Sequence, residues 1–396
     1  MERSPKLILS FLGTGNYQSA KYPLDGEEYE TPYTQEAILR RYESEGYALK
    51  VLMTKEAEAK HAALLGERVK YEPVPIPSGH TEEELWEIFN IIVDNVPEGA
   101  ELIMDVSHGF RSQPILALAV LHFLQATKGV KVRRILYGFY DSGTQEAAFF
   151  DLTPFLALME WTQATRDLLE HGEGSHLREL LREIHGQSYQ VDGPKAKKLS
   201  SVGDALDRVE DALDLLRVKE TLESAKELLK HLGAAAQDVA QLPRSRPLGL
   251  LLDKLQERYY PLAAEDPFSP EGLRAQGKMM RLLLQTRRYT QAIALAREVL
   301  VTLACLQNGW NPLEEREVGE KWLSTKTKNK KSAAKDLQAL PLVSLWEETA
   351  DLRNDVAHAA MRENPARTGR LKEAIEKVCA RTEALLEAHL SQGAGG

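Results

Sequence analysis

Near the end of the sequence, the stretch "DLRNDVAH", residues 351–358, places Arg353 five positions before His358. Such a pair is suited to phosphate chemistry, because a guanidinium binds a phosphate through two hydrogen bonds and an imidazole exchanges a proton near neutral pH. The spacing alone decides nothing. Chance predicts roughly 0.7 such pairs in a chain of this composition, and a second pair joins Arg166 to His171.

The neighbours of the two pairs differ. His171 is followed by Gly172, which is typical of a helix end, with the histidine at the negative end of the helix dipole. Arg353 is followed by a polar residue, Asn354, and small alanines around His358 permit another helix to approach closely. The structural alternative is that Arg353 forms a surface ion pair with Asp351 or Asp355 and that His358 is a capping or core histidine. The pattern by itself favours that alternative.

A glycine-rich loop follows the first expected strand. In "FLGTGNY" it supplies Gly13, Thr14, Gly15 and Asn16. Gln18 stands where a dinucleotide fingerprint has its third glycine, and no helix starts at once, so a nicotinamide oxidoreductase is disfavoured. The glycines still allow backbone N–H groups to approach a phosphate or a base closely.

A second polar loop lies in "DVSHGFRSQP", between a buried strand and a buried helix. Its candidate ligand residues are Ser107, His108, Gly109 and Arg111. Ser112 is expected to cap the helix, whose positive end would then attract an anion. A serine hydrolase is disfavoured, because adjacent residues of a strand point to opposite faces and no G-x-S-x-G turn is present. An ordinary strand-to-helix turn held by polar side chains is the alternative.

The elements that must position these loops lie in residues 1–155. Six short apolar runs alternate with helical patterns, which predicts an α/β domain with a mostly parallel sheet. The expected strands are residues 6–13, 48–54, 69–76, 101–107, 132–139 and 147–153, and the expected helices are 34–44, 55–66, 81–96 and 112–128. Thr81 before three glutamates predicts a capped helix start. Residues 21–31 read as an extended or hairpin-like insertion. Open α/β sheets bind ligands at the carboxyl ends of their strands, where both loops lie.

Beyond residue 155 the strand patterns stop and the sequence predicts helices only. Proline and glycine cluster at 263–272, which suggests a linker between a helical connecting region, 156–270, and a terminal helical domain, 271–396. The basic run at 325–335 is expected to be a solvated loop, or a phosphate-attracting surface if a nuclease site lies beside it.

Composition limits the class of protein. A net charge of −9 argues against a surface that coats nucleic acid throughout, although a local basic patch remains possible. The two cysteines, Cys305 and Cys379, lie in apolar surroundings and read as buried thiols. No metal-binding cluster is apparent. The run "PILALAVLHFLQ" is too short to span a bilayer, so a cytoplasmic protein without a membrane segment is the simplest interpretation.

Several motifs together resemble one known family. The pattern D-x-[ST]-H-G from Asp105 to Gly109, the text "LSFLGTGNY" and "YETPYTQEA" are similar to the DxTHG family of CRISPR-associated proteins, and "LRNDVAHA" resembles the R-N-x-x-x-H motif of HEPN ribonucleases. Ser107 replaces the usual threonine but keeps the hydroxyl. The resemblance implies a Rossmann-like CARF sensor domain for cyclic oligoadenylate, 1–155, and a C-terminal HEPN ribonuclease domain, 271–396.

The resemblance also implies a mechanism. Arg353, Asn354 and His358 are expected to be catalytic. Two copies of the helix that carries them would meet in a homodimer, or in a higher oligomer. The expected reaction cleaves single-stranded RNA without a metal and leaves a 2′,3′-cyclic phosphate and a 5′-hydroxyl. The expected activator is cyclic oligoadenylate, with the tetra-adenylate favoured and the hexa-adenylate possible. A sensor that regulates a partner without cutting RNA, and a sensor that also cleaves its own ligand, are the alternatives.

Overall fold

Strands and helices occupy different parts of the chain. The computed structural model describes residues 4–110, 112–190, 193, 195–241, 246–328, 340–361 and 365–393. Within those residues all strands lie before Leu152, and every later regular element is a helix. The chain divides into two compact units, Met1–Glu160 and Trp161–Gly396, which are described separately.

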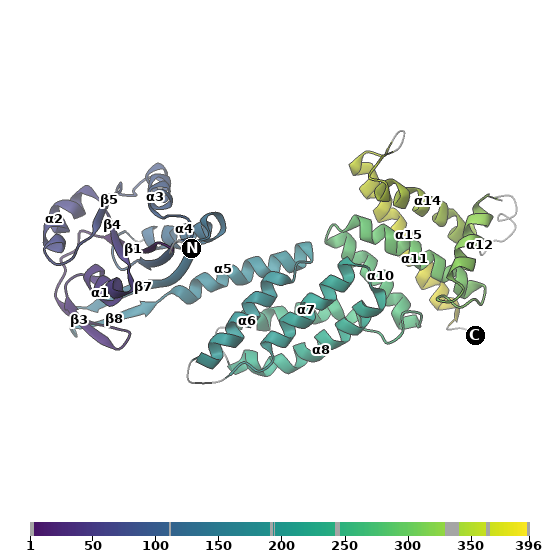
Figure 1. The fold of residues 1–396 in the computed structure, drawn as a ribbon, viewed down its shortest axis with the longest axis horizontal. Helices are drawn as coiled ribbons and strands as arrows, with labels where there is room; N and C mark the ends of the chain where they lie inside the picture. The colour runs from purple at the N-terminus through teal and green to yellow at the C-terminus, as the bar shows by residue number, and fades with distance from the viewer. Residues whose placement is uncertain are drawn as a thin grey trace. The chain divides into compact units, whose positions relative to one another are not determined.

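The first unit contains a six-stranded sheet (Figure 1). Its strands are β1 (Lys6–Leu12), β4 (Ala48–Met53), β5 (Glu72–Pro75), β6 (Glu101–Asp105), β7 (Lys131–Asp141) and β8 (Glu146–Asp151). Their order is β5-β4-β1-β6-β7-β8, and all neighbours are parallel except β7 and β8. The predicted α/β domain with a mostly parallel sheet is confirmed. The expected insertion is a separate antiparallel hairpin, β2 (Ala20–Leu24) and β3 (Glu27–Thr31).

Helices cover both faces of this sheet. Helices α1 (Thr34–Tyr42), followed by a short 3₁₀ turn at Glu43–Glu45, and α2 (Lys55–Gly66) pack on one face, and α3 (Glu82–Asn95) and α4 (Ser112–Lys128) on the other. In β1, Ile8 belongs to the cluster beneath α1 and α2, whereas Leu9 belongs to the cluster beneath α3 and α4. Burial on both faces explains why β1 is an almost continuous apolar run instead of an alternating one.

The starts of α3 and α4 differ in how they are capped. Thr81 Oγ1 accepts a hydrogen bond from Glu84 N at 3.2 Å, and the Glu84 carboxylate accepts one from His80 N at 2.7 Å, so the predicted cap is confirmed. The prediction that Ser112 caps the next helix is wrong, because α4 begins at Ser112 itself. Gln113 reaches back instead, and its Oε1 accepts from Phe110 N at 3.1 Å.

Helix α4 buries only one side within this unit. Ala117, Val120 and Leu124 lie in the core beneath it, whereas Ile115 is 75% exposed and Phe123 is 43% exposed. The sequence predicted a buried helix here, with no exposed side. In the unit by itself the second side of α4 is open to solvent.

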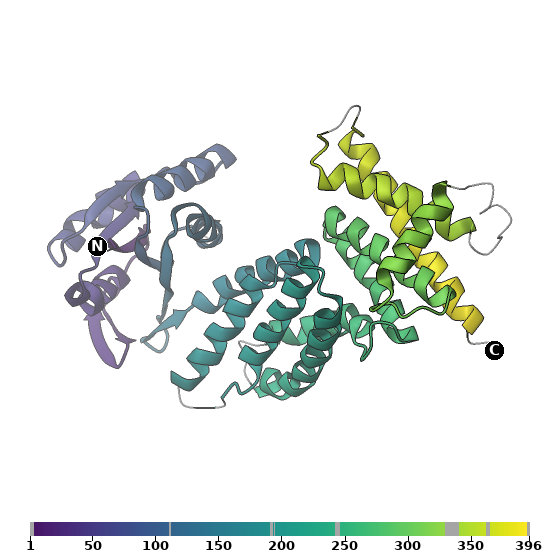
Figure 2. The same ribbon diagram turned by 45° about the vertical axis from the view of Figure 1, so that its right-hand side comes forward.

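The second unit is helical throughout its described residues. Its elements are α5 (Thr153–Arg166), which starts in the first unit, a π-helix (Asp167–His171), α6 (Ser175–Gln190), α7 (Leu199–Asp214), α8 (Val218–Gln241), α9 (Arg246–Tyr259), a 3₁₀ turn (Tyr260–Leu262), α10 (Pro270–Gln285), α11 (Tyr289–Gln307), α12 (Arg316–Lys328), α14 (Leu340–Ala357) and α15 (Thr368–Gly393). Helices α6, α7 and α8 lie side by side in both views (Figures 1 and 2).

One hydrophobic core runs through this unit. Leu262, Ala264 and Leu273, on either side of the expected linker at 263–272, all belong to it. Ser269 within that stretch caps α10 by accepting from Gly272 N at 3.0 Å. The two compact units divide at Glu160 and Trp161, close to the expected boundary at residue 155, and the further division at residue 270 stays a prediction.

The structure of this unit tests two further predictions from the sequence. Residues 325–328 are the last turn of α12, so the first part of the basic run is helical and not a loop, while residues 329–335 lie outside the described residues. The π-helix ends at His171, and Gly172 follows with φ of +73°, which confirms the helix end predicted there. Helix α11 is long and apolar enough to cross a membrane, but it is mostly buried in the core of this unit.

Candidate functional site

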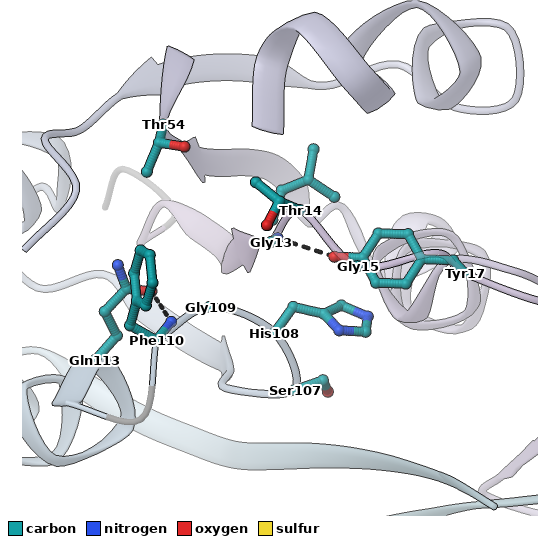
Figure 3. A pocket seen from close by; sticks show the side chains of 11 residues that line it. Gly13, Thr14, Gly15, Tyr17, Thr54, Ser107, His108, Gly109, Phe110 and Gln113 are labelled. Atoms are coloured by element: carbon teal, nitrogen blue, oxygen red, sulfur yellow. Dashed lines mark hydrogen bonds between the residues drawn. The ribbon is translucent and has the colours of Figure 1, made fainter. Parts of the chain in front are cut away.

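A pocket of about 250 Å³ lies at the carboxyl ends of β1 and β6 (Figure 3). It is lined by Leu12, Gly13, Thr14, Gly15, Tyr17, Thr54, Ser107, His108, Gly109, Phe110 and Gln113. The structure therefore brings together the two loops that the sequence singled out. Asn16 lines a neighbouring cavity of about 330 Å³, which shares Tyr17 with the first. Arg111 lies outside the described residues.

Glycines allow the two loops to approach each other. A Cβ atom on Gly13 would lie 3.1 Å from the backbone nitrogen of Gly109, tighter than ordinary contacts. Gly109 has φ of +109°, and a Cβ atom there would collide with the Gln113 side chain. Only glycine adopts that backbone conformation without strain. The close approach of the loops thus depends on residue type at both positions.

A fully buried carboxylate, Asp105, holds the second loop. Its Oδ2 accepts from the hydroxyls of Ser10 at 2.7 Å and Thr34 at 3.0 Å, and its Oδ1 accepts from Ser107 N at 2.9 Å and from the Ser107 hydroxyl. The Ser107 hydroxyl in turn accepts from Gly138 N at 2.6 Å. Ser107 lines the pocket, but its hydroxyl is bound within the protein. Its role in ligand binding stays a prediction.

The segment "YETPYTQEA" stabilises the first loop through hydrogen bonds. Gln35 Nε2 donates to the carbonyl of Phe11 at 2.8 Å, at the end of β1. The Tyr33 hydroxyl lies 3.2 Å from His61 Nδ1, and His61 Nε2 lies 2.8 Å from the carbonyl of Gly15. These contacts explain why buried polar residues occur at the start of α1.

Tyr17 forms an aromatic wall of the pocket. Its ring centroid lies 4.3 Å from that of His108 and 4.6 Å from that of His61, and its hydroxyl accepts from Gly13 N at 2.9 Å (Figure 3). Burial raises the pKa of the Tyr17 hydroxyl above its usual value, so the phenol stays neutral. A ring with a polar tip suits a site that must contact both an apolar base and a backbone amide.

The two histidines are neutral near pH 7. Burial lowers the pKa of His108, against the attraction of Asp105, and burial also lowers the pKa of His61. His108 Nε2 is buried and has no hydrogen-bond partner among the described residues. A buried polar atom of this kind requires an explanation, and a ligand that supplies the missing partner is one.

A lysine of α2 contacts the first glycine loop. Lys60 Nζ donates to the carbonyl of Thr14 and to Asn16 Oδ1, both at 2.7 Å. The site thus combines glycine amides, one ammonium group and neutral aromatic rings, a set suited to a ligand with phosphates and bases. Among the described residues no three His, Cys, Asp or Glu side chains gather to hold a metal.

Sequence analysis missed several residues of this site. They are Tyr17, Thr54, Lys60, His61, Phe110 and Gln113. Tyr17, Phe110 and Gln113 lay inside the quoted motifs, so proximity in sequence was an available signal. Lys60 and His61 lie on α2, where no local pattern connects them to the glycine loop 44 to 46 residues earlier.

The expected catalytic residues lie on the surface of the second unit. Arg353 and Asn354 are exposed in the last turn of α14, and Arg353 Nη1 lies 3.4 Å from Asn354 Oδ1. His358 is also exposed, and its backbone N–H donates to the carbonyl of Asn354 at 3.0 Å. The sequence placed His358 on the same helix as Arg353, but α14 ends at Ala357 and His358 begins a turn.

That turn has an unusual backbone. Ala359 and Ala360 have φ of +51° and +58°, a conformation that costs a non-glycine residue roughly 1 to 2 kcal/mol. The Ala360 N–H donates to the carbonyl of Asp355 at 3.0 Å, and the buried Asp355 carboxylate accepts from Ala366 N at 3.3 Å. Asp355 thus stabilises the chain reversal that places His358 beside Asn354.

Two family models of known proteins match this chain, one within the first unit and one within the second. Residues 7–141 match the family model of the CARF domain of CRISPR system endoribonuclease Csx1, and residues 157–261 match that of the second domain of CRISPR-associated protein MJ1674. The chain is 24% identical over 294 residues to MJ1674 of Methanocaldococcus jannaschii, covering 72% of this chain but only 42% of that protein.

A solved structure also aligns with the whole chain. Csm6 of Enterococcus italicus, bound to cyclic hexa-2′-fluoro-hexa-dAMP, covers 97% of this chain and 94% of its own, with 12% identity and a TM-score of 0.44.

Proposed function

The chain is a CRISPR-associated protein with an N-terminal CARF domain, and we propose that it is a ribonuclease controlled by cyclic oligoadenylate. The observation that carries the proposal is the pocket itself. Two glycine loops and the rings of Tyr17 and His108 line one cavity at the carboxyl edge of the sheet, and Lys60 and His61 of α2 hydrogen-bond to the backbone of the first loop. These are the groups that phosphates and stacked adenines require.

The activator in this proposal is cyclic oligoadenylate, with tetra-adenylate favoured and hexa-adenylate as the other ring size. Gly13, Thr14, Gly15, Gly109 and the loop around Ser107 would face the phosphates. Tyr17 and His108 would stack on adenine rings. Two copies of the pocket in a homodimer would present matching surfaces to a two-fold symmetric ring. The exposed Ile115 and Phe123 of α4 support a second subunit near this unit.

The nuclease site would lie at Arg353, Asn354 and His358. The Arg353 guanidinium would stabilise the negative charge of the phosphate in the transition state, with Asn354 positioned beside it. His358 would exchange the proton of the attacking 2′-hydroxyl or of the leaving 5′-oxygen. Cleavage by the RNA's own 2′-hydroxyl leaves a 2′,3′-cyclic phosphate and a 5′-hydroxyl and involves no metal in the proposed mechanism.

This site would be complete only in a dimer. The three side chains are exposed on one protomer, and an effective phosphoryl-transfer site holds its charges away from water. Two copies facing each other would provide two arginines and two histidines around one scissile phosphate. Residues 271–396, from α10 to α15, would then be a HEPN domain, and the substrate would be single-stranded RNA during type III CRISPR defence in the cytoplasm.

Cleavage assays test both halves of the proposal. A fluorescent single-stranded RNA is incubated with the full-length protein, with EDTA present, and with cyclic tri-, tetra- or hexa-adenylate or none. Stimulation by one ring size and analysis of the ends as cyclic phosphate and 5′-hydroxyl are expected. Unchanged cleavage by Arg353→Ala with His358→Ala would remove the catalytic assignment, and a sensor that only regulates a partner would then be the better account.

A second activity has specific support. His108, with its unpartnered Nε2, lines the pocket beside the proposed ligand, so it is positioned to assist slow cleavage of the ligand's phosphodiester by an adenylate 2′-hydroxyl. Incubation of the ligand with a His358→Ala protein, followed by chromatography, tests this activity. Linear adenylates that vanish in His108→Ala are expected, and an intact ring would contradict it.

A further inference from the structure

Helix α12 carries a face that combines aromatic and basic side chains. The members of this α12 face are Val318, Lys321, Trp322, Thr325, Lys326 and Lys328. They repeat at intervals of three or four residues, so they share one side of the helix. Gly319 and Leu323 are buried against the core and adjoin the edge of the face that Trp322 and Lys326 form. The hydrophobic core therefore fixes the direction in which the α12 face points.

Much of this face is open to solvent. Val318 is 46% exposed, and Lys321, Thr325 and Lys328 are also exposed. Trp322 is partly exposed and also packs against the core of the unit, as Trp310 does. An exposed valine beside a partly exposed tryptophan is an apolar surface that water solvates poorly, and a flat aromatic partner would cover it.

A second tryptophan extends the surface. Trp310, in the turn after α11, lies with its ring centroid 6.3 Å from that of Trp322, at an interplanar angle of 77°. The Lys326 ammonium lies 5.5 Å from the centre of the Trp322 ring. Indole rings beside ammonium groups form the usual platform for single-stranded nucleic acid, because bases stack on the rings while phosphates pair with the cations.

The charges on this side of α12 suit a polyanion. Three lysines occupy the face, against a formal charge of −9 for the whole chain. The acidic residue Glu320 points toward α11, where its carboxylate pairs with Arg297. Glu317 is the exposed acidic residue next to the face and lies one turn before Lys321. The carboxyl-terminal half of α12 is therefore locally positive.

The α12 face also lies in the same helical unit as Arg353. Arg297 of α11 connects the helices, because it pairs with Glu320 of α12 and its guanidinium lies 5.0 Å from the Trp346 ring of α14. Arg353 lies seven residues further along α14, which is about 10 Å of helix.

We propose that the α12 face, together with Trp310, binds single-stranded RNA. A base would stack on Trp322, and Lys321, Lys326 and Lys328 would pair with the phosphates on either side. The inference deepens the proposed ribonuclease function by assigning a substrate-binding surface. Because RNA binding is measurable without cleavage, the two ideas can fail separately.

The test measures binding by the full-length protein in a His358→Ala background, so that RNA stays intact. Fluorescence anisotropy follows labelled U12 and A12 at several salt concentrations. In the variant Lys321→Gln with Lys328→Gln, two exposed cations are lost. We expect affinity to fall about 10-fold at low salt and the slope of log K against log salt to shrink by about 1.4, since each neutralised phosphate of a single strand contributes about 0.7.

Matched controls separate the face from general effects. Lys219→Gln with Lys230→Gln removes two exposed lysines of α8 and should leave affinity and slope unchanged. Trp322→Leu should weaken binding about 10-fold, whereas Trp86→Leu, at a 59% exposed position of the first unit, should not. If Trp322→Leu fails to fold, the lysine variant decides the question, because its two positions are on the surface.

Three outcomes are decisive. Wild-type affinity in the lysine variant, or an equal loss in its control, overturns the inference. A change in sedimentation of the lysine variant without a change in RNA affinity overturns it also, and assigns the face to a protein contact. If the protein with His358 intact cleaves no RNA while U12 binding still depends on the α12 face, the ribonuclease proposal fails and the inference stands.

Discussion

The pocket of the first unit and the Arg353 surface of the second use polar residues in opposite ways. In the pocket, Asp105 is fully buried and receives hydrogen bonds from three side chains, so the loops are fixed before any ligand arrives. At the other surface, Arg353 and His358 are exposed and only a turn holds them together. In the proposed account the first site is therefore built within one protomer, and the second is completed by another subunit.

The histidines show the same contrast. His61 is buried and His108 is partly buried, the rings of both lie tilted against Tyr17, and burial lowers the pKa of both. His358 is open to solvent. In the proposed account the buried imidazoles hold the ligand pocket, whereas the exposed imidazole of His358 faces the RNA. Four predictions test whether this contrast between a prebuilt pocket and an open half-site is correct.

The largest expected effect is on catalysis. Because an acid or base contributes about 10² to 10⁴ in rate, His358→Ala should slow activated RNA cleavage by about 1,000-fold. Ligand affinity, measured by calorimetry, should not change, since His358 belongs to the other unit. The matched control is His171→Ala, the histidine of the second Arg and His pair, which should cleave normally. Equal losses in both variants would contradict a special role for His358.

The next effect is on stability. Asp105→Ala leaves the hydroxyls of Ser10, Thr34 and Ser107 without their buried acceptor, so it should destabilise the first unit by about 3 kcal/mol. Hydrogen exchange of residues 4–110 and 112–160 in the full chain measures this loss. Asp94→Ala, an exposed aspartate of α3, should change stability by less than about 0.5 kcal/mol. Equal protection in the two variants would show that the brace is unimportant.

A third effect separates backbone strain from ligand contact. Gly109→Ala should weaken binding of the preferred cyclic oligoadenylate about 30-fold, because a Cβ atom there displaces Gln113 and strains the loop. Gly129→Ala is the control, since Gly129 also has positive φ, at +60°, but no atom lies within 4 Å of the added Cβ. It should cost stability without changing affinity. If both variants bind equally well, the Gly109 loop does not contact the ligand.

The smallest expected effect is on pH dependence. The pKa values of His61 and His108 are lowered from 6.5 in the folded protein, so the unfolded chain binds more protons below that pH. Stability of the first unit is therefore complete above pH 6.5 and falls as the pH drops below it, by at most about 1.4 kcal/mol per histidine and pH unit. Urea denaturation at pH 7.5 and 5.5 measures the loss. His61→Gln with His108→Gln should flatten the profile, and an unchanged profile would contradict the assignment.

The sequence predicted the strands correctly because a strand that is buried on both faces is an almost continuous run of apolar residues. Six apolar runs, such as "KLILSFL" at Lys6–Leu12, correspond to the six strands of the sheet. The two glycine-containing loops were also predicted from local sequence, because each directly follows an expected strand. Open α/β sheets bind ligands at that end of their strands. Local sequence was therefore sufficient to predict the strands and the loops that follow them.

Features that depend on distant residues were not predictable in this way. Lys60 and His61 contact the first glycine loop because α2 packs on the sheet, and no sequence pattern near these two residues predicts the contact. Leu262 and Leu273, on either side of the expected linker, pack in one hydrophobic core, which the proline and glycine pattern between them does not predict. The end of α14 at Ala357 likewise depends on Asp355, whose carboxylate contacts the chain eleven residues later. Tertiary contacts decided each of these cases.

The most direct test of the central claim is the initial rate of cleavage of a single-stranded RNA with and without cyclic tetra-adenylate and cyclic hexa-adenylate. The account predicts that one ring raises the rate at least about 10-fold in the wild-type protein, and that neither ring does so in Gly109→Ala at the same concentration. Equal rates with and without either ring in the wild-type protein would contradict a ligand-controlled ribonuclease.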